Sequence, residues 1–331
     1  MDKYFPEHSE EFRQAIEAIK GKPLAILGHL RPDGDCIGSQ VGLARCLREQ
    51  GFDVVCYNEH IVPPNCSSFV GDTPFFRADE GVDPERIAIS VDCADHRRLG
   101  QALQEAYPDV YLNIDHHISN TLYGKHNIID GHASAAGEIL GGMILDTGMP
   151  MDPVAAQALY VGIATDTGQF RFSSTTKDTF EICCHLMEQG ADPAKAALAL
   201  YEQESPAKLA LLQHFLASFQ YVCDGRACIG TLDEQAWKES GARKEDTEGL
   251  VDYARSIEGV EIGILLEERE GAVKGSFRAK DPIQRVDLLA KKFNGGGHAC
   301  AAGFNPDCTL EELRPRIEAA LVEHFASLEE N

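Results

Sequence analysis

The sequence predicts an α/β protein, in which a mostly parallel, doubly wound sheet domain is joined by a helical linker to a smaller α/β domain. Three observations support this fold class. Short apolar runs alternate with amphipathic stretches over the first 190 residues, a pattern typical of parallel strands covered by helices on both faces. An Ala/Leu-rich helical stretch follows, and a second group of strand-like segments begins after Tyr221. The length of 331 residues suits about two domains.

The elements of the first domain, expected over residues 1–190, can be placed one by one. Residues 24–29 form an apolar run typical of a buried strand, and the turn-rich residues 31–35 lead into an amphipathic helix at 37–50. Further strands are predicted at 53–58, 86–92 and 110–115, and further helices at 134–145, 153–164 and 176–189.

We expect a helical linker over residues 191–222 and a second domain over residues 223–331. The second domain is predicted to contain strands at 226–232, 260–267 and 272–279, and helices near 248–257, 286–293 and 310–328.

Charge and composition limit the function. The net charge of −23, from 30 basic and 53 acidic residues, argues against binding of long nucleic acid, which needs a basic face. We find neither an apolar run of about 18 residues that could span a membrane nor a signal peptide. The 11 cysteines form no CxxC pair, which suits reduced thiols. We therefore expect a cytoplasmic protein.

Acidic and histidine side chains follow three of the predicted strands of the first domain and one of its helices. Ligands of an open parallel sheet bind outside the carboxyl ends of the strands. The residues that follow the strands are His29, Asp33, Asp35, Asp92, Asp115, His116 and His117, and Asp166 follows the helix at 153–164.

This mixture of residue types indicates a metal centre. Carboxylates suit Mg²⁺ and Mn²⁺, and imidazole shifts the preference toward Mn²⁺. Two ions about 3.5–4 Å apart can activate a water molecule and stabilise a phosphoryl group. One ligand must bridge the two ions, and we expect Asp92 to be that ligand.

Simpler interpretations remain open for single residues. Asp33 and Asp35 could cap the helix that begins near Ile37. His96, His126 and His132 are expected to be surface or hydrogen-bonded histidines outside the centre.

The second domain offers a weaker signal. The run Gly295-Gly296-Gly297-His298 is typical of a helix cap or hinge, but glycines also let a backbone approach a phosphate closely. Arg278, on a predicted strand, could be an ordinary surface cation.

Taken together, these motifs resemble the DHH phosphoesterase family, in the branch with the DHH-associated C-terminal domain. Within it the chain is most similar to the stand-alone nanoRNase/pAp-phosphatase (oligoribonuclease) and cyclic-dinucleotide phosphodiesterase groups. The matching pieces span most of the chain: residues 28–35 (GHLRPDGD), 91–92 (VD), 115–117 (DHH), 165–168 (TDTG) and 294–303 (NGGGHACAAG).

The resemblance implies a role for each site residue. His29, Asp33 and Asp92 would hold one Mn²⁺, with Mg²⁺ or Co²⁺ as substitutes. The ligands of the second ion would be Asp35, Asp92, His116 and Asp166. Asp115 would orient a histidine and His117 would face the phosphate, both as catalytic residues. The residues expected to bind substrate are Arg278, Gly296, Gly297 and His298.

The resemblance also implies a substrate class. We expect hydrolysis of two- to five-nucleotide RNAs to mononucleotides, with 3′-phosphoadenosine 5′-phosphate (pAp) as a second substrate. A phosphodiesterase for cyclic or linear dinucleotides is the nearest alternative, and a non-catalytic nucleotide sensor or RNA-binding module is an alternative of another class. The GGGH run argues against a family II pyrophosphatase. The expected partners are short RNA or dinucleotides, with no long nucleic acid and no membrane; a homodimer is compatible with the sequence.

Overall fold

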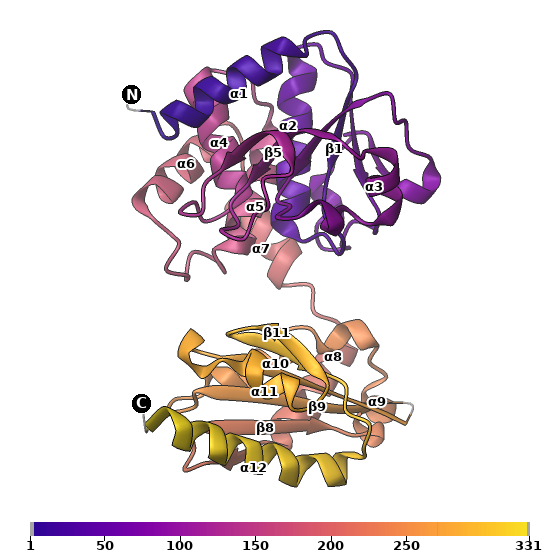
Figure 1. Cartoon of the computed structure of the whole chain (residues 1–331), viewed down its shortest axis with the longest axis vertical. Coiled ribbons are helices and arrows are strands. Elements are labelled where there is room, and N and C mark those ends of the chain that lie inside the picture. Colours follow the sequence, from indigo (N-terminus) through magenta and orange to yellow (C-terminus); the bar gives the residue numbers. More distant parts are fainter. Residues whose placement is uncertain (1–2, 270, 330–331) are drawn as a thin grey trace. The chain divides into compact units, whose positions relative to one another are not determined.

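The computed structural model describes residues 3–269 and 271–329 and divides into two compact units. The first ends at Gln203 and the second begins at Glu204 (Figure 1). The segment 191–222, expected to be a linker, contributes helix α7 (Pro193–Tyr201) to the first unit and α8 (Pro206–Ala217) to the second.

The first unit contains a six-stranded sheet in the order β3-β2-β1-β4-β5-β6, and each neighbouring pair is parallel. The predicted fold class is therefore confirmed. The strands are β1 (Leu24–Leu27), β2 (Val54–Asn58), β3 (Phe75–Arg77), β4 (Ile87–Val91), β5 (Val110–Asp115) and β6 (Gly124–Ile129).

Helices cover both faces of this sheet, as a doubly wound arrangement requires. Along β1, Leu24 and Ile26 belong to a core formed with the larger group of helices, whereas Ala25 and Leu27 belong to a core on the opposite face with α3. Side chains on both faces of the strand are thus buried, which explains why the strands are continuous apolar runs. The helices are α1 (Pro6–Ala18), α2 (Gly34–Glu49), α3 (Gln101–Ala106), α4 (Ala136–Thr147), α5 (Pro153–Asp166) and α6 (Lys177–Glu188), with short 3₁₀ turns at Ser67–Phe69, Ala78–Glu80 and His96–Leu99.

A glycine stripe on α2 brings this helix unusually close to α5. A Cβ atom at Gly38 would lie 2.3 Å from the carbonyl oxygen of Ala158 and 2.9 Å from the backbone nitrogen of Gly162. Gly34 and Gly42 lie one turn away on either side, and a Cβ atom at either position would come too close to a side chain of α5. The close approach of the two helices therefore depends on residues without a side chain at these positions.

Gly38→Ala is expected to destabilise the first unit by about 1–3 kcal/mol, because the added methyl group meets backbone atoms that cannot rotate away. Urea unfolding of the full chain measures this loss. Gly296→Ala is the matched control, since a Cβ atom there would meet no atom within 4 Å. Wild-type stability in Gly38→Ala would show that the two helices can separate at no cost.

The second unit contains a mixed six-stranded sheet in the order β11-β12-β10-β9-β8-β7. β8 and β9 are parallel and the other neighbours are antiparallel. The strands are β7 (Gln220–Val222), β8 (Ala227–Leu232), β9 (Ile262–Arg269), β10 (Ala272–Ala279), β11 (Gly295–His298) and β12 (Ala301–Phe304).

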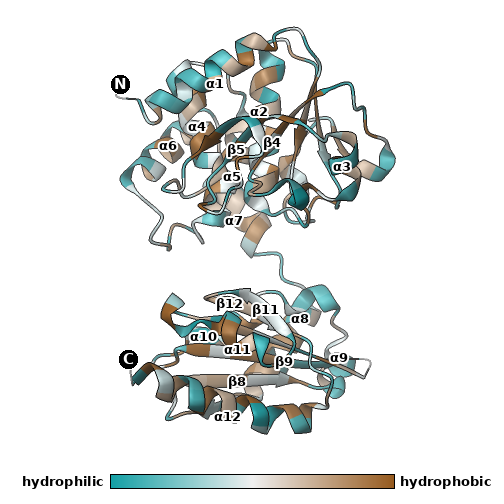
Figure 2. Cartoon of the chain, viewed as in Figure 1, coloured by the Kyte–Doolittle hydropathy of each residue, from teal (hydrophilic) through white to brown (hydrophobic). Residues whose placement is uncertain are grey.

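Helices also pack on both faces of the second sheet. One core joins the sheet to α11 (Val286–Lys291) and α12 (Leu310–Glu329), and a second core joins β8 and β9 to α8, α9 (Glu234–Ser240) and α10 (Leu250–Ser256). 3₁₀ turns lie at Lys244–Thr247 and Pro282–Gln284. In each unit brown, apolar colouring lies on several strands and helices, whereas many of the loops are teal (Figure 2). No helix in the described part of the chain is long and apolar enough to cross a membrane.

Candidate metal centre

The order of the strands explains where the centre lies. β1 and β4 are neighbours in the middle of the first sheet, and the chain leaves them toward opposite edges. At such a switch point the loops diverge and leave room for a ligand. His29 follows β1, Asp92 follows β4 directly, and Asp115 is the last residue of β5. Three adjacent strands therefore deliver these side chains to one edge.

The first group of ligand atoms surrounds His29. Its Nε2 lies 3.2 Å from Oδ2 of Asp92 and 3.8 Å from Oδ1 of Asp33. Its Nδ1 lies 2.8 Å from the carbonyl oxygen of Leu30. This contact makes Nδ1 the protonated nitrogen and leaves the lone pair of Nε2 directed at the two carboxylates, as a metal ligand requires.

The second group surrounds His116. Its Nε2 lies 3.2 Å from Oδ2 of Asp166, 3.6 Å from Oδ1 of Asp92 and 4.0 Å from Oδ2 of Asp35. Its Nδ1 faces the carbonyl oxygen of Ala133 at 3.4 Å. The orientation again frees Nε2 for a metal ion. The close packing of α2 on α5 brings Asp35 and Asp166, one from each helix, to the same histidine.

Asp92 takes part in both groups, one carboxylate oxygen facing each histidine. Its backbone adopts the left-handed conformation, with φ of 51°, which aspartate and asparagine tolerate better than most residues. Oδ1 of Asp92 and Nε2 of His116 are both buried, and neither has a hydrogen-bond partner among the described residues. Two unpartnered ligand atoms 3.6 Å apart are the arrangement expected around a seat for a cation.

The electrostatics of the cluster point the same way. Burial raises the pKa of Asp92 to about 6. Burial and then the charges of Asp92 and Asp166 raise the pKa of Asp35 well above its ordinary value. Burial by itself would lower the pKa of His116, but the neighbouring carboxylates raise it to about 10. Crowded, buried carboxylates need positive charge, which divalent ions would supply.

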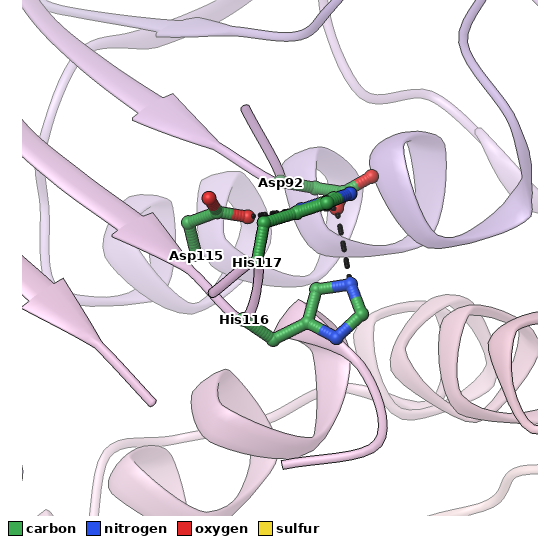
Figure 3. A group of neighbouring side chains, drawn as sticks. All are labelled: Asp92, Asp115, His116 and His117. Carbon is green, nitrogen blue, oxygen red and sulfur yellow. Dashed lines mark hydrogen bonds and ion pairs between the residues drawn. The ribbon is translucent and has the colours of Figure 1, made fainter. Parts of the chain in front are cut away.

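Asp115 and His117 lie next to Asp92 and His116 (Figure 3), and Nδ1 of His117 is 3.6 Å from Oδ1 of Asp92. Oδ1 of Asp115 lies 2.7 Å from Nδ1 of His117, and Oδ2 accepts a hydrogen bond of 2.6 Å from the amide of Asn120. Asp115 is buried, while the His117 side chain is 34% exposed. The pair thus holds the His117 ring in place at the open side of the centre.

Asp33 caps the helix that follows it, as the alternative interpretation held, but Asp35 does not cap that helix. Asp33 is the N-cap of α2 and accepts a hydrogen bond of 3.1 Å from the backbone of Cys36. Asp35 instead accepts hydrogen bonds of 2.7 and 2.9 Å from the backbone of Ala136 and Gly137, at the start of α4. Both carboxylates therefore have structural roles in addition to their place in the cluster.

Two polar residues near the centre were missed by the sequence analysis. Asn120 secures Asp115, and Arg98 lies half-buried after β4. Burial raises the pKa of Asp33, but His29, the backbone N–H of Cys36 and, least, Arg98 together outweigh this effect and lower the pKa below its ordinary value. The only signal for Arg98 in the sequence is that this basic residue follows Asp92, the aspartate at the end of β4, within a few positions. Cys36 is buried next to His29, and burial raises its pKa to about 12, as expected for an inert thiol.

The predicted substrate-binding residues gather on one sheet of the second unit. Arg278 on β10 pairs with Ala301 on β12, which in turn pairs with His298 on β11. Directly paired residues share a face, so Arg278 and His298 flank a small residue on the same face. Gly296 lies on this face as well, opposite Gly303.

The glycine run is a strand, so the alternative interpretation as a helix cap or hinge is wrong. Gly297 has φ of 149°, and a Cβ atom there would lie 2.4 Å from the carbonyl oxygen of Ala301. Gly296, in contrast, faces open space. Glycine is therefore required at position 297 for β11 to pair with β12, and Gly296 leaves the surface of the sheet flat.

Sequence comparisons agree with this architecture. Residues 23–163 match the N-terminal domain of the DHH family, and residues 224–323 match the DHHA1 domain. The chain belongs to the DHH family. The bifunctional oligoribonuclease and PAP phosphatase NrnA of Thermus thermophilus is 29% identical to this DHH protein over 97% of the chain and 96% of the relative. The Bacillus subtilis protein of the same name is 27% identical over 83% and 86%.

Solved structures show the same DHH fold. An exopolyphosphatase-related protein from Bacteroides fragilis superimposes with a TM-score of 0.87 at 24% identity, covering 98% of both chains. Exonuclease RecJ bound to manganese superimposes with a TM-score of 0.52 at 18% identity, covering 98% of this chain and 94% of RecJ. The His/Asp cluster of this DHH domain has the residue types and spacing to hold divalent metal ions.

Proposed function

We propose that this DHH protein is a manganese-dependent phosphodiesterase that hydrolyses RNAs of two to five nucleotides to mononucleotides and also dephosphorylates pAp. The observation that carries the proposal is the unpartnered pair of ligand atoms on Asp92 and His116, buried among further carboxylates. The substrate class is supported by the names of the Thermus thermophilus and Bacillus subtilis relatives, which are similar over most of their length.

The proposed role of each residue follows from its contacts. His29, Asp33 and Asp92 would hold one ion, and Asp35, Asp92, His116 and Asp166 the other. When bound, two such ions lower the pKa of a water molecule and offset charge on the phosphoryl oxygens. His117 is held through Nδ1 by Asp115 and its side chain is partly exposed, so its Nε2 would donate a hydrogen bond to a phosphate oxygen.

The choice of Mn²⁺ rests on the donor set. The cluster combines imidazole nitrogens with several carboxylates, and Mn²⁺ accepts both. A closed structural zinc site would instead use four thiolate or imidazole ligands. Cys36, the thiol nearest to His29, has a raised pKa and donates to Gln40, so it does not supply a thiolate.

We further propose that Arg278, Gly296, Gly297 and His298 bind the substrate. Arg278 is half-buried and His298 is exposed. The two side chains lie on one face of the sheet, with Ala301 between them. Arginine forms paired hydrogen bonds with phosphate, and the flat glycine surface leaves room for a nucleotide beside it.

A substrate panel tests the proposed activity. The purified chain is incubated with dinucleotides, pAp, cyclic dinucleotides and a 24-nucleotide RNA, with and without Mn²⁺. We expect manganese-dependent release of mononucleotides from dinucleotides and of phosphate from pAp. Turnover of cyclic dinucleotides alone would favour a signalling phosphodiesterase, and binding without turnover would favour a sensor.

Activity is expected to fall steeply with RNA length beyond about five nucleotides. The net charge of −23 repels a long polyanion, whereas a short substrate needs only a few local cations. Initial rates on a series from dimer to 24-mer, at constant ionic strength, measure this dependence. Equal rates for the dimer and the 24-mer would favour a processive exonuclease.

A further inference from the structure

The turn that connects β6 to α4 touches two ligands of the second ion through its backbone. The carbonyl oxygen of Ala133 faces Nδ1 of His116 at 3.4 Å. The backbone nitrogens of Ala136 and Gly137 donate to the two carboxylate oxygens of Asp35 at 2.7 and 2.9 Å. The orientation of both ligands thus depends on the position of five consecutive residues, 133–137.

One buried carboxylate holds this turn. Glu138 is 3% exposed, and its Oε2 accepts hydrogen bonds from the backbone nitrogen of Ser134 at 3.0 Å and from the hydroxyl of Ser134. The same oxygen accepts a hydrogen bond of 3.0 Å from the hydroxyl of Thr179 on α6. Glu138 therefore ties the turn to its own helix and to a neighbouring helix at a single point.

We infer that Glu138 is a positioning residue for the second metal ion, through the turn that orients Asp35 and His116. The inference rests on the two-ion centre proposed above. Within the described part of the chain Glu138 makes no hydrogen bond or ion pair with the side chains of Asp35 and His116, so its action is indirect. It fixes Ser134, which lies between the carbonyl of Ala133 and the amides of Ala136 and Gly137.

The effect should be confined to one ion. His29 is oriented by the carbonyl of Leu30, and Asp33 by the backbone of Cys36. Neither contact involves the turn at 133–137. A residue that merely stabilised the fold would weaken both ion sites or neither, whereas loss of Glu138 should weaken only the site that contains Asp35 and His116.

Two substitutions separate the hydrogen bonds from the charge. Because all three donors converge on Oε2, the amide oxygen of glutamine can take its place, so Glu138→Gln should keep the turn in position. Glu138→Met has a similar length and no acceptor oxygen. Asp146→Leu is the matched control: this carboxylate lies near the other end of α4 and also accepts three hydrogen bonds, from the backbone of Tyr4 and Phe5 and the hydroxyl of Ser9.

The experiment titrates each metal-free full-length variant with Mn²⁺ by calorimetry and follows its thermal unfolding. We expect the wild-type chain to bind two ions. In Glu138→Met we expect the affinity for Mn²⁺ to fall by about 10–100-fold at one site, the range typical when a residue that orients a metal ligand is lost. Glu138→Gln should retain both affinities. Asp146→Leu should lower the unfolding temperature and leave both affinities unchanged.

Other results would overturn the inference. Unchanged affinities in Glu138→Met, equal loss at both sites, or the same loss in Asp146→Leu would each contradict a positioning role. If Glu138→Met does not fold, Thr179→Val removes one of the three donors without changing side-chain shape, and should weaken the same single site to a smaller degree. Fewer than two ions in the wild-type chain would contradict the two-ion centre itself, without reference to any variant.

Discussion

Replacing Asp92 by asparagine is expected to lower turnover about 1000-fold or more, because this residue is the one shared by both groups of ligand atoms and metal activation of water dominates such reactions. The fold should survive, since asparagine also tolerates the left-handed backbone at this position. Initial rates on a dinucleotide at saturating Mn²⁺, together with the unfolding temperature, measure both effects.

Asp79→Asn is the control for this change. Asp79 is exposed and pairs with Arg77 at the end of the edge strand β3, which β2 and β1 separate from β4 and Asp92, so the same loss of charge should leave turnover unaltered. Activity close to wild type in Asp92→Asn would contradict the assignment of Asp92 as the shared ligand.

Arg278→Ala is expected to lower kcat/KM for a 5′-phosphorylated dinucleotide by about 10- to 150-fold, the equivalent of one charge-assisted hydrogen bond of about 1.5–3 kcal/mol. Hydrolysis of a small aryl phosphodiester should change little, because that substrate has no second phosphate or nucleoside to bind. Steady-state kinetics on the two substrates provide the comparison, since a misfolded or metal-depleted variant would lose both activities.

Lys274→Ala is the matched control for Arg278→Ala. Lys274 lies on the same strand and the same face, and its charge is already paired with Glu267 at 3.1 Å. It should leave both activities at the wild-type level. If Arg278→Ala and His298→Ala both leave dinucleotide kinetics untouched, the second domain does not bind the substrate in the proposed way.

The central strands and most of the long helices could be predicted from the sequence because their signal is local. β1, β4 and β5 are apolar runs that end in polar residues, and this pattern also located His29, Asp92 and Asp115. The rule that ligands collect at the carboxyl ends of parallel strands then placed these residues together before any distance was known.

The strands that were missed lie mainly at the edges of the sheets, and helices α1, α3 and α9 were also missed. β6 reads Gly-Lys-His-Asn-Ile-Ile, half polar because one side of an edge strand faces solvent, and β3 has only three residues. β11 consists of glycine and histidine, whose low strand propensity is overcome by pairing with β12. These strands are stabilised by pairing with a neighbouring strand, and such pairing leaves no periodic pattern in the sequence.

The supporting contacts of the centre were invisible for the same reason. Glu138 looks like an ordinary helix residue until the fold brings Thr179 to it from 41 positions away. The glycines of α2 were visible in the sequence, but their purpose depends on which helix packs against them.

The left-handed backbone at Asp92 also bears on how this protein can diverge. Glutamate offers the same ligand chemistry but would meet a steric cost of about 1–2 kcal/mol in this conformation, as would most other residues. Asparagine and glycine fit the backbone and lack the carboxylate. The substitutions that the chain accommodates most easily at this position are therefore those that abolish the chemistry, so that a descendant could become a stable nucleotide-binding protein without turnover in a single step.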